Sequence, residues 1–188
     1  MGEFEPVFPL KAIIFQILLL LVATALEAGV LRQRLRLGYQ KSVQYAAVIN
    51  LLSVVLGWFV FLIAEPLVDA RLRAQIVSYI LFDRFLNNSL MPQMGWIVLI
   101  VGLGAFFATL LVKLKGLELL MRLSGTWTIP DQSSEVGRDE KYLRARTGRT
   151  VQQKASSDFI ATVLRANALS FSAILILLIL RTYLVTVS

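Results

Sequence analysis

Four polar side chains interrupt otherwise apolar stretches of the sequence, and they are the first candidates for chemistry. Glu27 lies near the end of one apolar run and Asn50 lies within a second, while Arg165 and Asn167 lie within the last. For Glu27 we favour an ion pair with a nearby arginine over a proton or ion site. For the two asparagines we favour a hydrogen bond to a neighbouring helix over ligand binding. For Arg165 we favour snorkelling to the lipid headgroups over a buried functional charge.

The residue types that most enzymes and metalloproteins need are missing from the chain. It has no cysteine and no histidine. This removes disulfides, thiol nucleophiles, the usual zinc and iron–sulfur sites and histidine-ligated haem. The usual proton carrier near pH 7 is missing as well, and no phosphate-binding loop or catalytic triad is present. We therefore expect a protein that is not an enzyme, with no catalytic residue, metal or cofactor beyond bound lipids.

The composition indicates that lipid is the solvent of this protein. Of the 188 residues, 57% are hydrophobic and only 16% are charged, and the mean hydropathy is +0.71. A water-soluble domain of this length carries more charge. The predicted fold class is therefore all-α, a single polytopic membrane helix bundle. We expect about four transmembrane helices plus an outer amphipathic interfacial helix.

The transmembrane spans follow from the lengths of the apolar runs. The predicted spans are 8–31, 43–63, 95–114 and 159–187. As a helix the first is roughly 36 Å long, enough to cross with some tilt, and its acidic start argues against a signal peptide. Charges interrupt 67–91, which we interpret as an interfacial amphipathic segment, with a re-entrant segment or a lid as alternatives. Residues 124–157 form the predicted polar cytoplasmic loop.

Small residues at a spacing of four predict close helix contacts. Ser53 and Gly57 have this spacing, and so do Gly104 and Ala108. Small side chains let helix backbones approach one another in a membrane, within one chain or between chains. These four residues are therefore candidates for helix packing.

The basic residues predict the orientation of the chain. Most of the nineteen Lys and Arg residues flank the spans in two segments. The first holds Arg32, Arg34, Arg36 and Lys41, and the second holds Lys113, Lys115, Arg122, Arg138, Lys141, Arg144, Arg146, Arg149 and Lys154. With four spans both segments face the same side, which is the cytoplasm. Both termini are then non-cytoplasmic.

The formal net charge of +7 fits anionic lipid headgroups rather than nucleic acid. The expected basic contacts are Arg32, Arg34, Arg36, Arg144, Arg146 and Arg149. Docking of a cytoplasmic partner is the alternative for the second basic segment.

An ordered series of short motifs resembles a known family over about the first 115 residues. The motifs are Phe15-Gln16, Glu27-Ala28, Arg34-Leu35, Leu37, Ser42-Val43-Gln44-Tyr45-Ala46, Ile49-Asn50-Leu51, Gly57-Trp58, Glu65-Pro66, Tyr79-Ile80-Leu81-Phe82-Asp83-Arg84-Phe85 and Phe106-Phe107-Ala108-Thr109. In this order they resemble FraC, the filament integrity protein family of cyanobacteria. The resemblance implies a plasma-membrane protein at the septa between cells, which supports filament integrity and intercellular exchange. It also implies a partner of the FraD type, and a homo-oligomer is expected.

Two other functions remain open on the residues alone. A small transporter or channel subunit would use Glu27, Asn50 and Asn167 to line a water-filled path. An accessory scaffold subunit of a thylakoid or respiratory complex would use the helices only for packing.

Overall fold

The computed structural model describes residues 10–82, 89, 91–127 and 151–187. The described residues form helices and connecting turns, in the order α1 (Leu10–Arg34), α2 (Tyr39–Ala64), the 3-10 helix η1 (Glu65–Leu67), α3 (Ala70–Phe82), the 3-10 helix η2 (Met91–Gln93), α4 (Met94–Leu123) and α6 (Val151–Val187). The predicted all-α class is confirmed. Arg144, Arg146 and Arg149 lie outside the described residues.

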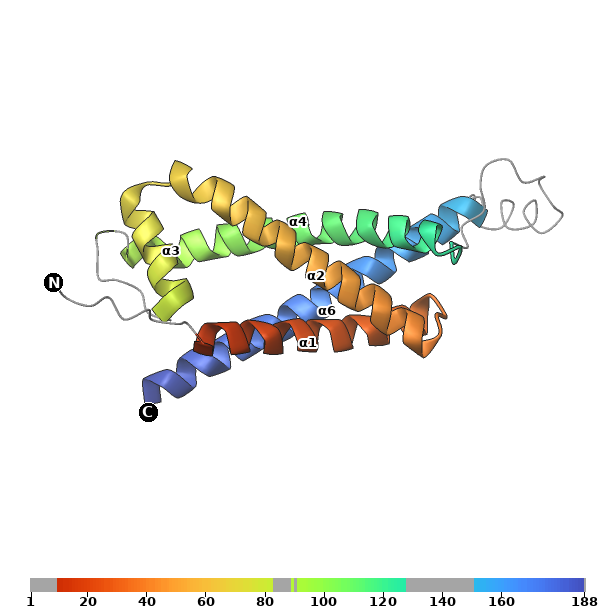
Figure 1. Cartoon of the computed structure of the whole chain (residues 1–188), viewed down its shortest axis with the longest axis horizontal. Helices are drawn as coiled ribbons and strands as arrows, with labels where there is room; N and C mark the ends of the chain where they lie inside the picture. Colours follow the sequence, from red (N-terminus) through yellow and green to blue (C-terminus); the bar gives the residue numbers. More distant parts are fainter. Residues whose placement is uncertain (1–9, 83–88, 90, 128–150, 188) are drawn as a thin grey trace.

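Four of these helices, α1, α2, α4 and α6, are long and apolar enough to cross a membrane. They form a bundle in which α1 packs against α2 and α6, and α4 packs against the same two helices. The chain reverses direction from each long helix to the next, so that the start of α1 and the end of α6 lie at the same end (Figure 1). The multi-pass arrangement predicted from apolar length is therefore present.

The two ends of the bundle differ in what they contain. At one end lie Arg34 and Arg122, in the last turns of α1 and α4, and we name it the basic end. At the other end α3 runs across the bundle near the start of α4 (Figure 1), and we name it the α3 end. Helix α3 begins after Asp69, whose carboxylate accepts a hydrogen bond from the Arg71 backbone N–H at 3.1 Å, as an N-cap does.

Specific residues end the long helices. Pro66 follows α2 and occupies the first turn of η1, where its missing N–H does no harm. Helix α4 ends at Leu123, and Gly125 follows its C-cap with a φ of +66°, which glycine adopts without strain. The backbone N–H groups of Gly125 and Thr126 donate to the carbonyls of Arg122 and Met121. This is a Schellman motif, which satisfies the last carbonyls of a helix.

Two of the long helices extend beyond the membrane spans predicted for them. Helix α4 continues to Leu123, whereas the predicted span ends at 114, because the apolar period persists through Leu117 and Met121, both buried. Helix α6 begins at Val151, inside the predicted loop 124–157. Its first two turns are polar, and polarity is compatible with a helix that extends past the apolar layer.

The packed core lies in the half of the bundle nearest the basic end. It consists of residues buried between the long helices: Ala28, Leu31, Tyr45, Ala46, Ile49, Leu117, Met121, Phe159 and Val163. Toward the α3 end, large apolar side chains such as Phe59, Ile63, Trp96 and Ile100 are exposed instead. Exposed apolar surface of this extent suits lipid rather than water.

Candidate functional site

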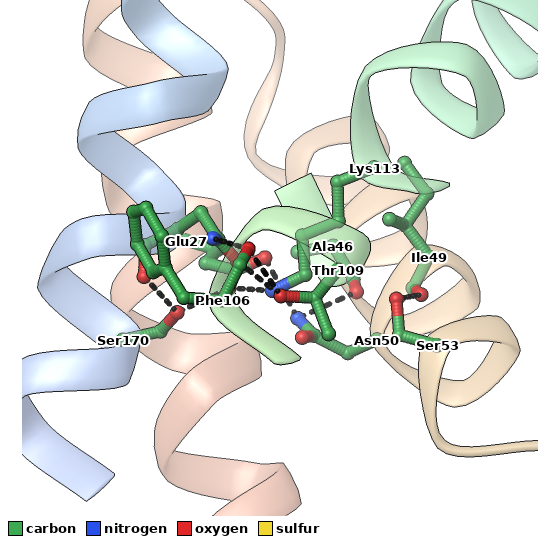
Figure 2. Close-up of polar contacts among 10 residues, drawn as sticks. Glu27, Ala46, Ile49, Asn50, Ser53, Phe106, Thr109, Lys113 and Ser170 are labelled. Carbon is green, nitrogen blue, oxygen red and sulfur yellow. Dashed lines mark hydrogen bonds and ion pairs between the residues drawn. The ribbon is translucent and has the colours of Figure 1, made fainter. Parts of the chain in front are cut away.

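A buried polar network crosses the bundle next to the packed core. We use this name for six residues: Glu27 of α1, Asn50 of α2, Thr109 and Lys113 of α4, and Asn167 and Ser170 of α6. Five of the six are buried and Thr109 is half-buried. Each long helix contributes at least one member, and the side chains meet between the helices (Figure 2). The network thus ties all four helices together at one level.

Glu27 is the centre of this network. Its Oε1 pairs with the ammonium group of Lys113 and accepts the Ser170 hydroxyl at 2.5 Å. Its Oε2 accepts the Asn50 amide at 2.9 Å. A buried carboxylate is tolerated only when it is paired and hydrogen-bonded. Glu27 meets that condition with partners from the three other long helices.

A second set of hydrogen bonds joins α4 to α6 on the side of the network nearer the α3 end. The Asn167 amide donates to the backbone carbonyl of Phe106 at 3.2 Å, and the Thr109 hydroxyl donates to the same carbonyl at 3.0 Å. Thr109 also lies 3.5 Å from the Asn167 side-chain oxygen. Phe106 in turn stacks edge-on against Phe171 of α6, with ring centroids 5.4 Å apart.

Helix geometry places the network inside the hydrocarbon layer. Asn50 follows Lys41 by nine residues and Lys113 precedes Arg122 by nine, which is about 13 Å along each helix. The hydrocarbon core of a bilayer is about 30 Å thick. If those basic side chains mark the headgroup level, the Glu27–Lys113 pair lies well within the apolar layer. Charges at such depth are retained when they compensate one another.

An interhelical cavity of about 420 Å³ lies on the side of the network facing the α3 end. Its walls are apolar side chains from α1, α2 and α6, such as Leu20, Trp58 and Ile174. Its floor is formed by Asn50, Lys113, Asn167 and Ser170, all members of the polar network. On the far side of the floor the core residues fill the space and leave only about 10 Å³. The larger space between the helices therefore lies on the α3 side of the polar network, and the packed core lies on its other side.

At the basic end, side-chain contacts join the turn after α4 to α2 and α6, and we name this set of contacts the latch. The Tyr45 hydroxyl of α2 lies 2.5 Å from the Ser124 hydroxyl and 2.7 Å from that of Thr126, beyond the end of α4. Trp127 continues the latch by packing on Phe159 of α6, with ring centroids 5.3 Å apart. These contacts hold the turn after α4 against both α2 and α6.

The structure places the predicted intramembrane polar residues together. Glu27, Asn50 and Asn167 all belong to the polar network, and Asn50 bonds across to another helix. The partner of Glu27 differs from the expected one, because it is Lys113 of α4 and not an arginine of its own helix. Arg165 lies two residues before Asn167 but is exposed on the outer face of α6.

The predicted helix-packing residues do not make the expected contacts within this chain. Gly57 and Gly104 have no side chain within reach among the described residues, and Ala108 is exposed. The Ser53 hydroxyl donates to the Ile49 carbonyl of its own helix at 2.9 Å. A close approach occurs instead at Gly116, where an added Cβ would lie 3.6 Å from Leu52 of α2.

The basic residues at the end of α1 lie at the surface. Arg32, Arg34 and Arg36 are exposed, and Arg32 lies over the Tyr39 ring at 5.6 Å. At the opposite end Arg181 of α6 lies over the Phe15 ring of α1 at 4.2 Å.

Sequence reasoning missed three members of the network: Thr109, Lys113 and Ser170. Lys113 had the appearance of a flanking charge because it follows an apolar run and precedes Lys115. The available signal was the renewed apolar period after it, at Leu114, Leu117 and Met121. This period indicates that the helix continues beyond Lys113, so that Lys113 lies within the helix and not at its end.

Comparison with protein families matches residues 5–180 to the family described as filament integrity protein FraC. The match extends well beyond the first 115 residues and includes most of α6. No curated protein and no solved structure gave a significant match.

Proposed function

The chain belongs to the FraC filament integrity family, and from that premise we propose that it is a membrane-embedded assembly subunit of septal cell–cell junctions. In this role it supports filament integrity and intercellular exchange by associating with copies of itself and with a partner of the FraD type. The family is one of filament integrity proteins and not of enzymes. The proposed role requires helix association rather than a chemical reaction.

The observation that carries this proposal is that the polar residues bond to one another inside the chain, whereas the small residues of α4 remain exposed on its surface. The hydrogen bonds of the polar network join the four long helices within one chain, so that the bundle holds itself together. Gly104 and Ala108 on α4 remain exposed, with no side chain of the described part of the chain covering Gly104. Exposed small residues at this spacing allow a helix of another subunit to approach closely. We infer that this face of α4 is an assembly surface.

The test compares two substitutions on the outer face of α4. Gly104→Leu fills the small-residue face, whereas Leu99→Phe alters an apolar position that is 59% exposed. We expect Gly104→Leu to reduce the oligomer in mild detergent and the co-isolation of a FraD-type membrane partner, while Leu99→Phe leaves both unchanged. Equal oligomer size and partner recovery for both variants would reject α4 as the assembly surface.

The septal location is tested with the full chain carrying a fluorescent tag in filamentous cells. Fluorescence confined to the septa, together with fragmented filaments in a strain lacking the chain, is the expected result. Uniform fluorescence along the membrane with intact filaments would overturn the septal role.

A transporter or channel subunit is the second candidate, and the interhelical cavity is the observation in its favour. The cavity reaches the polar network at its floor, but the core residues block it beyond that level. A conducting path would therefore need a second subunit or a rearrangement. Variants that keep assembly and septal location but lose solute transfer between cells would favour this function.

A further inference from the structure

The interhelical cavity has the composition of a binding site rather than of a packing defect. An empty cavity in a protein interior is typically lined by apolar side chains alone. Here the walls include Leu20, Trp58, Phe171 and Ile174, but one end is formed by Asn50 and Lys113. Its volume of about 420 Å³ lies within the range of small-molecule sites. The cavity therefore has a largely apolar body, in which Gln16 and Ser53 are the polar exceptions, and a polar end at the network.

Lys113 gives that polar end an unused hydrogen-bonding capacity. An ammonium group carries three N–H donors. Among the described residues Lys113 has one acceptor, the Glu27 carboxylate. Hydrocarbon placed against the remaining N–H groups would leave them unpaired at a considerable cost. An occupant of the cavity is thus favoured when it offers an acceptor atom at the floor.

The charge of the floor indicates that the occupant is neutral. Glu27 already compensates Lys113, and its two oxygens also accept Asn50 and Ser170. A second anion beside this pair would add an uncompensated buried charge. A carbonyl oxygen accepts hydrogen bonds without bringing a charge. The apolar walls fit the remainder of a molecule that dissolves in the bilayer.

We propose that the interhelical cavity binds one neutral, membrane-dissolved amphiphile with its carbonyl group toward Lys113 and its hydrocarbon part between the helices. Two sources share this chemistry: a prenylquinone and an acylglycerol. The site is independent of septal location and of assembly, so its test does not depend on the proposed function.

Tryptophan quenching provides the first test, because Trp58 lines the cavity and is 40% exposed, whereas Trp96 does not line it and is 70% exposed. We would titrate a decyl-substituted benzoquinone into nanodiscs that hold the full chain with Trp58 as its single tryptophan (Trp96→Phe, Trp127→Phe). The matched background keeps Trp96 instead (Trp58→Phe, Trp127→Phe). We expect the quenching of Trp58 to contain a saturable component with a stoichiometry of one above the linear quenching by bulk quinone, and the quenching of Trp96 to be linear only.

Two variants connect the saturable signal to the cavity. Ser53→Phe fills the space beside the floor and should abolish saturation, whereas Val60→Phe on the lipid-facing side of the same helix should preserve it. The double change Glu27→Gln with Lys113→Met removes both charges and the donor together. It should weaken quinone binding about 10- to 100-fold, the usual effect of losing one hydrogen bond to a charged group.

Competition and native mass spectrometry separate the two sources. Displacement of the decyl-substituted benzoquinone by monoolein but not by a prenylquinone identifies an acylglycerol site. Displacement by a prenylquinone but not by monoolein identifies a quinone site. The unmodified chain should retain one such molecule in native mass spectra, and its Ser53→Phe variant should not. Linear quenching in both backgrounds, with no retained molecule in the unmodified chain, would overturn the proposal.

Discussion

Lys113 of α4 forms an ion pair with Glu27 of α1, although 86 positions separate them in the sequence. The two side chains are only 8% and 4% exposed. Because the pair lies among helices with little other polar surface, each charge depends on the other for its stability. Because of this dependence, replacing either residue alone should lower the stability of the bundle more than replacing both together.

Glu27→Gln and Lys113→Met should each destabilise the bundle strongly, and the double variant should recover most of the loss. Removing one partner leaves a buried charge uncompensated, which costs about 3–5 kcal/mol, whereas removing both leaves none. Thermal unfolding in mild detergent measures the effect. Glu118→Gln is the control, because Glu118 pairs with the exposed Lys115 and Arg122 and such pairs contribute about 0–1 kcal/mol. Single variants as stable as this control would contradict the prediction.

Asn50→Leu should lower the stability of the single chain, and not only its assembly. The substitution removes the donor to Glu27 Oε2 and the bond to the Ala46 carbonyl. Leaving a buried carboxylate oxygen without its partner costs about 1–3 kcal/mol. Ser53→Ala is the matched control on the same helix, because within the described part of the chain that hydroxyl bonds only to the Ile49 carbonyl. The prediction fails if the two variants have equal melting temperatures.

Gly116→Leu should destabilise the chain, while Gly104→Leu should not. At Gly116 an added Cβ already contacts Leu52 and Ile49, so that a larger side chain overpacks the contact between α4 and α2. Overpacking costs about 1–3 kcal/mol. A Cβ added at Gly104 has no atom of the described residues within 4 Å. The Gly104→Leu variant therefore changes only the helix propensity of α4 and its outer surface. Equal unfolding temperatures of the two variants would show that α4 and α2 lie farther apart at Gly116 than in the structure.

Tyr45→Phe should loosen the turn after α4 without unfolding the bundle. The change removes the hydroxyl that reaches Ser124 and Thr126, at a cost of about 1 kcal/mol. Amide hydrogen exchange at residues 124–127 should become faster, with exchange in the middle of α2 unchanged. Tyr39→Phe serves as the control because Tyr39 is 70% exposed. Unchanged exchange in the turn would mean that its backbone hydrogen bonds suffice to hold it.

Cysteine labelling tests the orientation of the bundle, since the chain has no native cysteine. Gln40→Cys lies at the basic end and Leu67→Cys at the α3 end. In intact cells a membrane-impermeant maleimide should label Leu67→Cys alone, and permeabilised cells should show both labelled. Labelling of Gln40→Cys in intact cells would reverse the predicted orientation.

Apolar length alone was sufficient to predict the four spanning helices, because a helix that crosses hydrocarbon needs about twenty apolar residues. It could not fix the helix ends. Helix α6 starts at Val151 because polar residues with good helix propensity can extend a span beyond the lipid.

The site was predictable only in part, and the reason is geometric. Glu27 and Asn50 stood out because a polar group in an apolar run needs a partner, but the sequence does not say on which helix that partner lies. Lys113 was hidden by its neighbour Lys115, because both follow an apolar run. Small-residue spacing likewise identifies a face suited to close packing and leaves open which helix packs there. Gly116 of α4 meets α2 inside the chain, whereas Gly104 of the same helix faces outward.

The uneven packing of the bundle has a mechanical consequence. The core residues hold the long helices together near the basic end, whereas the cavity lies between them toward the α3 end. A segment with few buried contacts opens at a lower free energy than a packed core does. The α3 end is therefore where the long helices separate first, while the basic end stays closed around its core.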